Sequence, residues 1–186
     1  YINTVNVVHA DHHCVAYNPL NNRMYDGNDG GIYWTANQGT SWTNISIGLG
    51  IGQIYKLGVS QTNKDKAIAG LQDNGTATHT ENGWITTSGG DGMECVFDPI
   101  DESYSYSSYQ NGVIIRNVNN VNNSTIANAD KFGINEEAAW ITPFCLVFNN
   151  PEIMIQGRQN LWISYNIRSS NVTWQKLTSG FDKHVN

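Results

Sequence analysis

A strand–turn–strand pattern recurs four times along the chain, and this repeat restricts the fold more than any other feature of the sequence. Each copy opens with a short segment centred on one anchor residue, and the four anchors are Tyr17, Ser60, Phe97 and Phe148. Successive anchors are separated by about 37 to 51 residues, close to the length of one four-stranded propeller blade, about 40–50 residues. The repeat therefore predicts an all-β fold, a β-propeller.

The segments after each anchor support this prediction. Second strands are expected at 23–26, 67–69, 104–107 and 153–155, and third strands at 32–34, 113–115 and 161–163. The turns between them are rich in Asn, Asp and Gly, which supply the positive φ angles of tight hairpins. We expect residues 1–186 to form a partial propeller of about four four-stranded antiparallel blades within a larger ring. Approximate blade limits are 14–52, 53–94, 95–144 and 145–186.

Composition excludes two classes of partner. The formal charge is −6, from 16 acidic and 10 basic residues, and no Lys/Arg cluster is present, so the sequence does not predict a nucleic-acid surface. No run of about 18 apolar residues occurs, so it predicts no membrane span either. Cys14, Cys95 and Cys145 lie near the expected first strands, and we expect them to be buried, inert thiols. A nucleophilic Cys14 beside His12 or His13 is the alternative.

One turn carries a recognisable motif, Thr35-Ala-Asn37-Gln-Gly39-Thr-Ser41-Trp42. A short Asn or Asp side chain in such a turn caps backbone N–H groups, Gly permits the left-handed step, and Trp packs between blades. A looser copy spans 164–174, and a remnant spans 81–84.

These motifs carry a family resemblance. The motif turn, His9-Ala-Asp-His-His13, Asn28-Asp-Gly-Gly31, Gly70-Leu-Gln-Asp-Asn-Gly75 and Gly89-Gly-Asp-Gly92 resemble the bacterial sortilin-type propellers, also labelled Asp-box (BNR-repeat) glycoside hydrolases. The resemblance is strongest over residues 7–115. It implies a ring with more blades than four and an extracellular or cell-surface location. We expect the chain, which opens within a strand, to be a fragment or processed product of a larger secreted protein.

Propeller topology predicts where the polar residues gather. Loops that enter the first strand of a blade lie on the same end as the turns between its second and third strands. These loops and turns should converge at the mouth of the central channel, and a polar concave rim is a candidate ligand site. The expected ligand-binding residues are His9, His12, His13, Asp29, Gln53, Gln72, Asp73 and Arg158.

Carboxylates on the same rim raise the question of catalysis. An inverting glycosidase uses two carboxyl groups about 6.5–9.5 Å apart, one as acid and one to activate water. Asp11, Asp91 and Glu94 are the catalytic candidates. Asp29 and Asp73 are more simply explained as residues that stabilise their own turns.

A metal is a further alternative. If residues 9–13 are extended, His9, Asp11 and His13 point to one side, and two imidazoles with a carboxylate can bind zinc. A local hydrogen-bonded network would use the same residues equally well. Oxygen ligands in the Asp/Asn-Gly turns suit calcium. The fold itself requires no cofactor.

Two functions follow from these observations. The first is a secreted or cell-surface module that binds a glycan or peptide at the mouth of the channel. The second is a glycoside hydrolase that uses paired carboxylates on the same face, so enzymatic activity is left open. In either case four blades leave two sheets uncovered, and the remaining blades must come from the parent protein or a partner chain.

Overall fold

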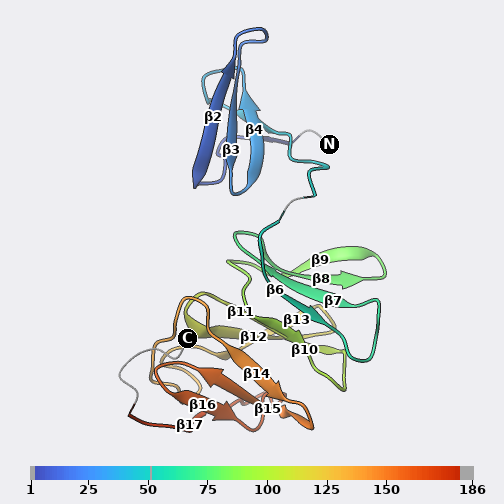
Figure 1. The fold of residues 1–186 in the computed structure, drawn as a ribbon, viewed down its shortest axis with the longest axis vertical. Helices are drawn as coiled ribbons and strands as arrows, with labels where there is room; N and C mark the ends of the chain where they lie inside the picture. The colour runs from blue at the N-terminus through green and yellow to red at the C-terminus, as the bar shows by residue number, and fades with distance from the viewer. Residues whose placement is uncertain (1–2, 51, 181–186) are drawn as a thin grey trace. The chain divides into compact units, whose positions relative to one another are not determined.

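The structure is a computed structural model that describes residues 3–50 and 52–180. It contains four antiparallel sheets (Figure 1). We name the sheets blades 1 to 4 in chain order, and each holds four strands paired in sequence order. Blade 1 has a fifth strand, β1, which pairs with the outermost strand β5. The predicted all-β architecture of four antiparallel blades is confirmed. Within the described ranges, no helix is long and apolar enough to cross a membrane.

The strands have the following limits. Blade 1 comprises β1 (Asn3–Val5), β2 (His12–Asn18), β3 (Arg23–Asn28), β4 (Gly31–Thr35) and β5 (Trp42–Asn44). Blade 2 comprises β6 (Ile54–Val59), β7 (Ala67–Leu71), β8 (Gly75–Thr80) and β9 (Gly83–Ser88). Blade 3 comprises β10 (Cys95–Phe97), β11 (Tyr104–Tyr109), β12 (Val113–Val118) and β13 (Asn122–Ala127). Blade 4 comprises β14 (Phe144–Val147), β15 (Asn150–Gly157), β16 (Leu161–Ser164) and β17 (Gln175–Lys176).

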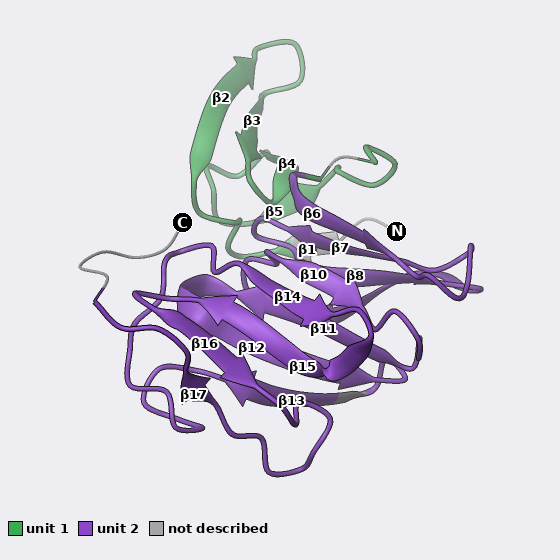
Figure 2. Ribbon diagram, turned by 60° about the horizontal axis from the view of Figure 1, so that its bottom comes forward, with its two compact units in different colours: residues 1–52 green, residues 53–186 purple. Residues whose placement is uncertain are grey.

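The chain divides into two compact units, residues 1–52 and residues 53–186 (Figure 2). Unit 1 is blade 1, and unit 2 contains blades 2, 3 and 4. β1 and the start of β2 precede residue 14, where the sequence placed the start of the first blade. Residues 181–186, which the sequence assigned to the fourth blade, lie outside the described residues.

The motif turn of blade 1 is closed by the side chains that the sequence singled out. Asn37 Oδ1 accepts hydrogen bonds from the Thr35 hydroxyl (2.8 Å) and from the backbone N–H of Ser41 (2.9 Å). The Thr35 hydroxyl oxygen in turn accepts from the N–H of Gly39 (3.1 Å), whose φ is +86°. Asn37 therefore does the capping expected of an Asx residue in this turn.

Blade 4 repeats this arrangement in its looser copy of the motif. Asn166 Oδ1 accepts from the Ser164 hydroxyl (3.1 Å) and from the N–H of Thr173 (3.1 Å). The indole N–H of Trp174 donates to Ile126 O of blade 3 at 2.7 Å, and this ring is buried between the two blades. The three additional residues in the turn leave the hydrogen bonding of the flanking strands unchanged.

The main core lies between blades 3 and 4. Blade 3 contributes Tyr106, Ile114 and Ile126, and blade 4 contributes side chains that include Met154 and Trp162. The second cluster, between blades 2 and 3, contains only Ile68, Cys95 and Phe97. Apolar burial, the dominant stabilising term in folding, is therefore concentrated at the joint between blades 3 and 4.

The three cysteines do not share one environment, which corrects the sequence-based expectation. Cys95 is buried, and burial raises the pKa of its thiol to about 11. Cys14 and Cys145 are exposed. The pairing registers shift between His12 and Cys14 and again after Leu146, and such a bulge changes which side of the sheet later residues face. The three thiols are therefore not equivalent positions of the repeat.

Glu136 fixes the segment that leads into blade 4, and the sequence did not reveal this role. Its carboxylate accepts hydrogen bonds from the N–H of Asn160 (3.0 Å), the Asn160 amide (2.8 Å) and the Trp162 indole (2.9 Å), and it forms an ion pair with Lys176 (2.5 Å). Burial acts to raise the pKa of Glu136, but these donors outweigh it and lower the pKa to about 2.

This depressed pKa predicts a specific pH dependence of stability. The carboxylate stabilises the fold fully above its ordinary pKa of 4.5, and the contribution is lost as the pH falls from there towards about 2. We expect Glu136→Gln to lower the free energy of unfolding at pH 7 by about 1–3 kcal/mol and to flatten its decline between pH 5 and pH 2.5. Urea unfolding at several pH values measures both. If Glu136→Gln does not change how steeply the free energy of unfolding falls with pH, Glu136 is not the group responsible. Glu137→Gln is the neighbouring control.

Candidate functional site

In unit 2 the entry loops are hydrogen-bonded to the turns between second and third strands, as propeller topology predicts. Gln72 N–H donates to Gln53 O (2.9 Å) in blade 2, and Gly157 N–H donates to Pro143 O (2.9 Å) in blade 4. Asn111 N–H of blade 3 donates to Trp140 O (3.3 Å), which belongs to the entry loop of blade 4. The first two contacts lie within one blade, and the third joins the loops of blades 3 and 4 along a shared rim.

Asp91 is the central carboxylate of this rim. It is only 9% exposed. Its Oδ1 accepts the N–H of Asp73 (2.7 Å) from the blade 2 turn, and its Oδ2 accepts the amide of Gln110 (2.5 Å) from the blade 3 turn. Asp73 has a φ of +58°, as a residue in a tight turn does. Asp91 thus ties two neighbouring blades together with both of its oxygens.

Three glycines let these two segments approach each other closely. A Cβ on Gly92 would lie 1.9 Å from Gly75 O, and a Cβ on Gly70 would lie 2.1 Å from Met93 O. Gly75 also has a positive φ of +69°. The two glycine-rich stretches that carry part of the family resemblance therefore share one physical purpose, which is backbone contact between the blade 2 turn and the blade 3 entry loop.

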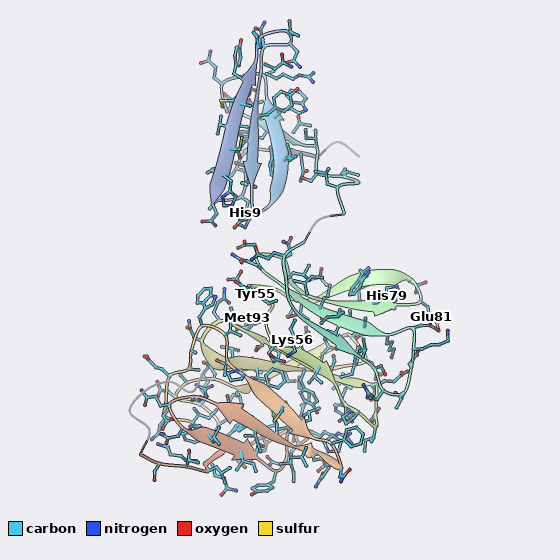
Figure 3. All side chains as sticks on the ribbon, in the orientation of Figure 1. His9, Tyr55, Lys56, His79, Glu81 and Met93 are labelled. Atoms are coloured by element: carbon cyan, nitrogen blue, oxygen red, sulfur yellow. The ribbon has the colours of Figure 1, made fainter. Side chains whose placement is uncertain are left out.

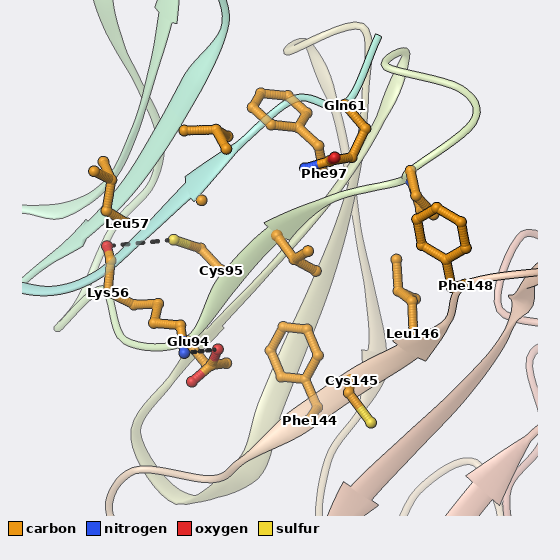
Figure 4. Close-up of a pocket in the computed structure, with 14 residues that line it drawn as sticks. Lys56, Leu57, Gln61, Glu94, Cys95, Phe97, Phe144, Cys145, Leu146 and Phe148 are labelled. Carbon is orange, nitrogen blue, oxygen red and sulfur yellow. Dashed lines mark hydrogen bonds and ion pairs between the residues drawn. The ribbon is translucent and has the colours of Figure 1, made fainter.

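Glu94 and Lys56 form an ion pair beside this contact (Figure 4). The Glu94 carboxylate and the Lys56 ammonium are 2.9 Å apart, with exposed side-chain fractions of 19% and 50%. The hydrogen bond to Glu94, followed by its negative charge, raises the pKa of Lys56. The neighbouring Tyr55 hydroxyl donates to Gln72 Oε1 (2.9 Å). Figure 3 shows Tyr55, Lys56 and Met93 grouped at one end of blade 2, with His79 and Glu81 at the other.

Two hollows border Glu94. The larger, about 560 Å³, is formed by the first strands β6, β10 and β14, and its lining is mainly apolar (Figure 4). The smaller, about 430 Å³, is lined by Glu94, Ala139, Trp140, Ile141 and Pro143. Trp140 is 52% exposed there. An accessible aromatic ring beside a carboxylate offers both a stacking surface and a hydrogen-bond acceptor.

Arg158 does not take the place that the sequence assigned to it. We expected it on the rim as a ligand-binding residue, but it is completely buried. Its guanidinium donates to Gln156 Oε1 (3.1 Å), Glu136 O (2.7 Å) and Gly112 O (2.7 Å). Burial lowers the pKa of Arg158 to about 10, which leaves it cationic at neutral pH. Arg158 therefore links the turn of blade 3 to the segment before blade 4, and its buried side chain is not available to a ligand.

In unit 1 the first two residues of β2 form two histidine–carboxylate pairs. His12 Nδ1 lies 2.9 Å from both oxygens of Asp26, a buried residue of β3 that also accepts the Asn28 amide (2.6 Å). His13 Nε2 contacts Asp29 Oδ1, and this bond, followed by the charge of Asp29, raises the pKa of His13. The carboxylate of Asp26 thus orients His12.

The proposed metal ligands in unit 1 are partly brought together. Oxygens of Asp11 and Asp29 lie within 4.8 Å of each other, and Asp29 carries His13. His9 Nδ1 lies 3.0 Å from Ala10 O, and the His9 side chain packs over Gly30. The gathered set is therefore Asp11, Asp29 and His13, more oxygen-rich than the predicted His9, Asp11 and His13. Metal binding by these three residues stays a prediction.

Sequence reasoning missed Asp26, Lys56 and Glu136. The alternation of β2 and β3 could have indicated Asp26, because that residue lies opposite the His-rich segment in a hairpin. Lys56 lies in an otherwise apolar strand at the channel end. A lysine in such a strand indicates a nearby acidic residue, because lysine is rarely buried unless it is paired. Glu136 lies between strands, and its partners are 24 to 40 residues away in sequence. No local signal points to it.

Comparisons with known proteins confirm the fold. No family model and no curated protein matches the sequence. Solved structures do match. An ancestral GH74 enzyme is 16% identical with a TM-score of 0.55, over 92% of this chain and 24% of that protein. The GH74 xyloglucanase from Xanthomonas campestris is 12% identical with a TM-score of 0.55, over 89% and 30%. The Dos1 propeller is 14% identical with a TM-score of 0.51, over 97% and 53%.

These likenesses are low in sequence identity, so they establish the β-propeller fold and nothing finer. The chain spans from about a quarter to about half the length of the proteins it resembles. The resemblance to sortilin-type Asp-box propellers, and with it a bacterial origin, stays a prediction.

Proposed function

We propose that this chain is a recognition module that binds a glycan or peptide at the channel mouth, on the rim around Trp140 and Glu94. The observation that carries the proposal is the exposed Trp140 ring in a hollow bordered by a carboxylate. Aromatic faces and a few placed polar groups are the usual lining of ligand sites. The hydrogen-bonded loops beneath the Trp140 ring would hold the ring in place before a ligand binds. Binding then loses less conformational entropy.

The bonding of Asp91 supports binding over hydrolysis. A general acid or a water-activating base needs an oxygen directed at the substrate. Both Asp91 oxygens are used to hold neighbouring loops, and Glu94 is ion-paired with Lys56. Of the three predicted catalytic carboxylates, Asp11 and Glu94 then remain as candidates for the hydrolase alternative. It is tested in the same experiment by measuring the release of reducing sugar ends.

The proposal includes a setting for the module. We propose an extracellular or cell-surface location, with the remaining blades supplied by the parent protein or by a partner chain. The fold does not demand a cofactor, and calcium or zinc at Asp11, Asp29 and His13 would be an addition to the recognition site of unit 2. Stoichiometric metal in the purified chain, measured by elemental analysis, would support that addition.

Calorimetric titration tests the proposed site. The probes are xyloglucan oligosaccharides, other soluble neutral and acidic polysaccharides, and a mixed peptide pool. We expect at least one probe to bind, and we expect Trp140→Ala to weaken its binding about tenfold, since an aromatic contact contributes about 1.5 kcal/mol.

Trp84→Ala is the matched control, because Trp84 is 54% exposed on β9, away from the rim. It should bind the probe as the unchanged chain does. Absence of binding to every probe, or equal losses in the two variants, would count against the proposed site. Release of sugar ends by the unchanged chain, lost in Glu94→Gln, would replace the binding module with the hydrolase.

A further inference from the structure

A third hollow lies on the rim of unit 2, between the turn of blade 3 and the loop that enters blade 4. Its volume is about 520 Å³, and that of the hollow beside Trp140 is about 430 Å³. Both lie within the range of about 300–1,000 Å³ that ligand pockets occupy. We name the first the amide pocket and the second the tryptophan pocket. The amide pocket is lined by side chains that include Tyr109, Gln110, Asn111, Asn128, Glu137 and Ala138.

The two pockets adjoin along one short segment, residues 137–140. Glu137 and Ala138 line the amide pocket, and the next two residues, Ala139 and Trp140, line the tryptophan pocket. Asn111 also lines the amide pocket, and its backbone N–H donates to Trp140 O (3.3 Å). An extended ligand that occupies both pockets therefore crosses only this segment.

Arg158 fixes both walls of the amide pocket. Its guanidinium donates to Gly112 O of the blade 3 turn and to Glu136 O, directly before Glu137 (2.7 Å each). The walls are also in close contact, because a Cβ on Gly112 would lie 2.5 Å from the Ala138 Cβ. They flank the joint between blades 3 and 4, which share the main core. The pocket is therefore held in shape before any ligand binds, and binding loses less conformational entropy.

Three side chains in the amide pocket are available to a ligand. Asn111 and Glu137 are exposed, and Asn128 is half-buried. Among the described residues, none supplies a hydrogen-bond or ion-pair partner to these three side chains. A side-chain amide offers donors and an acceptor, whereas a carboxylate offers acceptors only. The pocket therefore presents both kinds of group, and a sugar hydroxyl, which donates and accepts, can bond to either.

The charge of the two linings disfavours an acidic ligand. Each lining holds one carboxylate, Glu137 in the amide pocket and Glu94 in the tryptophan pocket, and its described residues include no lysine or arginine. The nearby Lys56 ammonium is already paired with Glu94. Like charges placed against each other across an interface are costly. A neutral ligand therefore fits these pockets better than an acidic polysaccharide.

The lining of the amide pocket favours a glycan over a peptide. Peptides are commonly bound at a free sheet edge, as a helix in an apolar groove, or as a proline-rich segment on aromatic rings. The amide pocket is built mainly from turns and loops and is lined by amides and a carboxylate, so it matches none of these modes. A sugar has apolar ring faces that suit the Trp140 ring and hydroxyls that suit the amide pocket.

We propose that the amide pocket is a second subsite, and that the two pockets together bind a neutral oligosaccharide. One sugar ring stacks on Trp140. The hydroxyls of another ring, further along the same oligosaccharide, form hydrogen bonds with Asn111, Asn128 and Glu137. The inference rests on the proposed recognition site at Trp140, and it narrows the ligand from a glycan or peptide to a neutral glycan long enough to reach both pockets.

Calorimetric titration with oligosaccharides of two lengths tests the second subsite. The probes are the disaccharide and the hexasaccharide of cellulose, mannan, xylan and a β-1,3-glucan, with a hexasaccharide of polygalacturonate and the mixed peptide pool beside them. We expect at least one neutral hexasaccharide to bind about tenfold or more tightly than its disaccharide, because contacts at two linked subsites reinforce each other.

Two variants separate the subsites. The double substitution Asn128→Ala with Glu137→Ala should weaken hexasaccharide binding about tenfold, to the level of the disaccharide, and should leave disaccharide binding unchanged. Trp140→Ala should weaken both ligands. The matched control is Glu81→Ala with Asn82→Ala, which removes an exposed carboxylate and an exposed amide at the other end of blade 2 (Figure 3). It should bind as the unchanged chain does, and circular dichroism melts establish that each variant folds.

The possible outcomes distinguish this inference from the proposed function. Equal affinities for the disaccharide and hexasaccharide, or a hexasaccharide affinity that the Asn128 and Glu137 substitutions leave unchanged, would overturn the second subsite while the site at Trp140 stands. Binding of only the polygalacturonate or the peptide pool would overturn the assignment to a neutral glycan. Absence of binding to every probe, or binding insensitive to Trp140→Ala, would overturn the proposed function and this inference together.

Discussion

Replacement of Arg158 by methionine is expected to lower the free energy of unfolding of unit 2 by about 3 kcal/mol or more. The substitution leaves Glu136 O and Gly112 O without their buried donor, and each buried acceptor left unpaired costs about 1–3 kcal/mol. The Gln156 side chain also loses its partner. Methionine fills much of the space, so the loss reports the missing hydrogen bonds more than a cavity. Urea unfolding followed by tryptophan fluorescence measures it.

The neighbouring Gln159 provides the control for Arg158. It is exposed in the same turn, and Gln159→Met should change the free energy of unfolding by less than about 0.5 kcal/mol. Arg158→Lys separates charge from geometry, because an ammonium cannot reproduce the planar fork of a guanidinium that reaches three acceptors. A loss below about 1 kcal/mol for Arg158→Met would show that the two carbonyl oxygens find other donors and that Arg158 is not the tie between blades.

The repeat was predictable because its signals are local. Each turn between second and third strands contains residues that favour positive φ, such as Asp73 and Asn111, and both do have positive φ. The capping by Asn37 also depends only on residues within one turn. Turns and their flanking strands can therefore be predicted from the sequence, and the division of the chain into antiparallel sheets follows from the spacing of the turns.

The environment of individual side chains was harder to predict, because it depends on bulges and on distant residues. Aligning the cysteines placed Cys145 with Cys95. The pairing registers instead put Phe144 in the core shared with blade 3 and turn Cys145 to the other side of the sheet. A single extra residue reverses which side a strand residue faces. Composition does not reveal where that residue lies.

The candidate site shows the same division. In unit 2 the predicted residues Asp73 and Asp91 do lie together, joined by a hydrogen bond. The sequence could not assign their roles, because an aspartate that binds substrate and one that holds a loop look identical in sequence. Arg158 illustrates the limit most clearly, since an arginine in a turn is normally exposed. Its burial requires Gly112, 46 residues away.

The substitution Gly92→Ala is expected to disrupt the rim strongly, although it adds only one carbon atom. The new Cβ would lie 1.9 Å from Gly75 O and 2.8 Å from Leu71 N, both backbone atoms that cannot rotate away. The blade 3 entry loop must then move off the blade 2 turn, which breaks the bond from Gly92 N–H to Leu71 O (2.9 Å) and that from Asp73 N–H to Asp91. We expect a loss of about 3 kcal/mol in stability.

Gly89→Ala is the matched control for Gly92, since it lies in the same loop, its Cβ would meet nothing within 4 Å, and its φ is not positive. It should leave the free energy of unfolding and ligand binding within error of the unchanged chain. If the proposed recognition site is correct, Gly92→Ala should also lose ligand binding, because Glu94 follows two residues later on the displaced loop. A stable Gly92→Ala chain would mean that the two loops are not in backbone contact, and the rigid rim on which the proposed site depends would not exist.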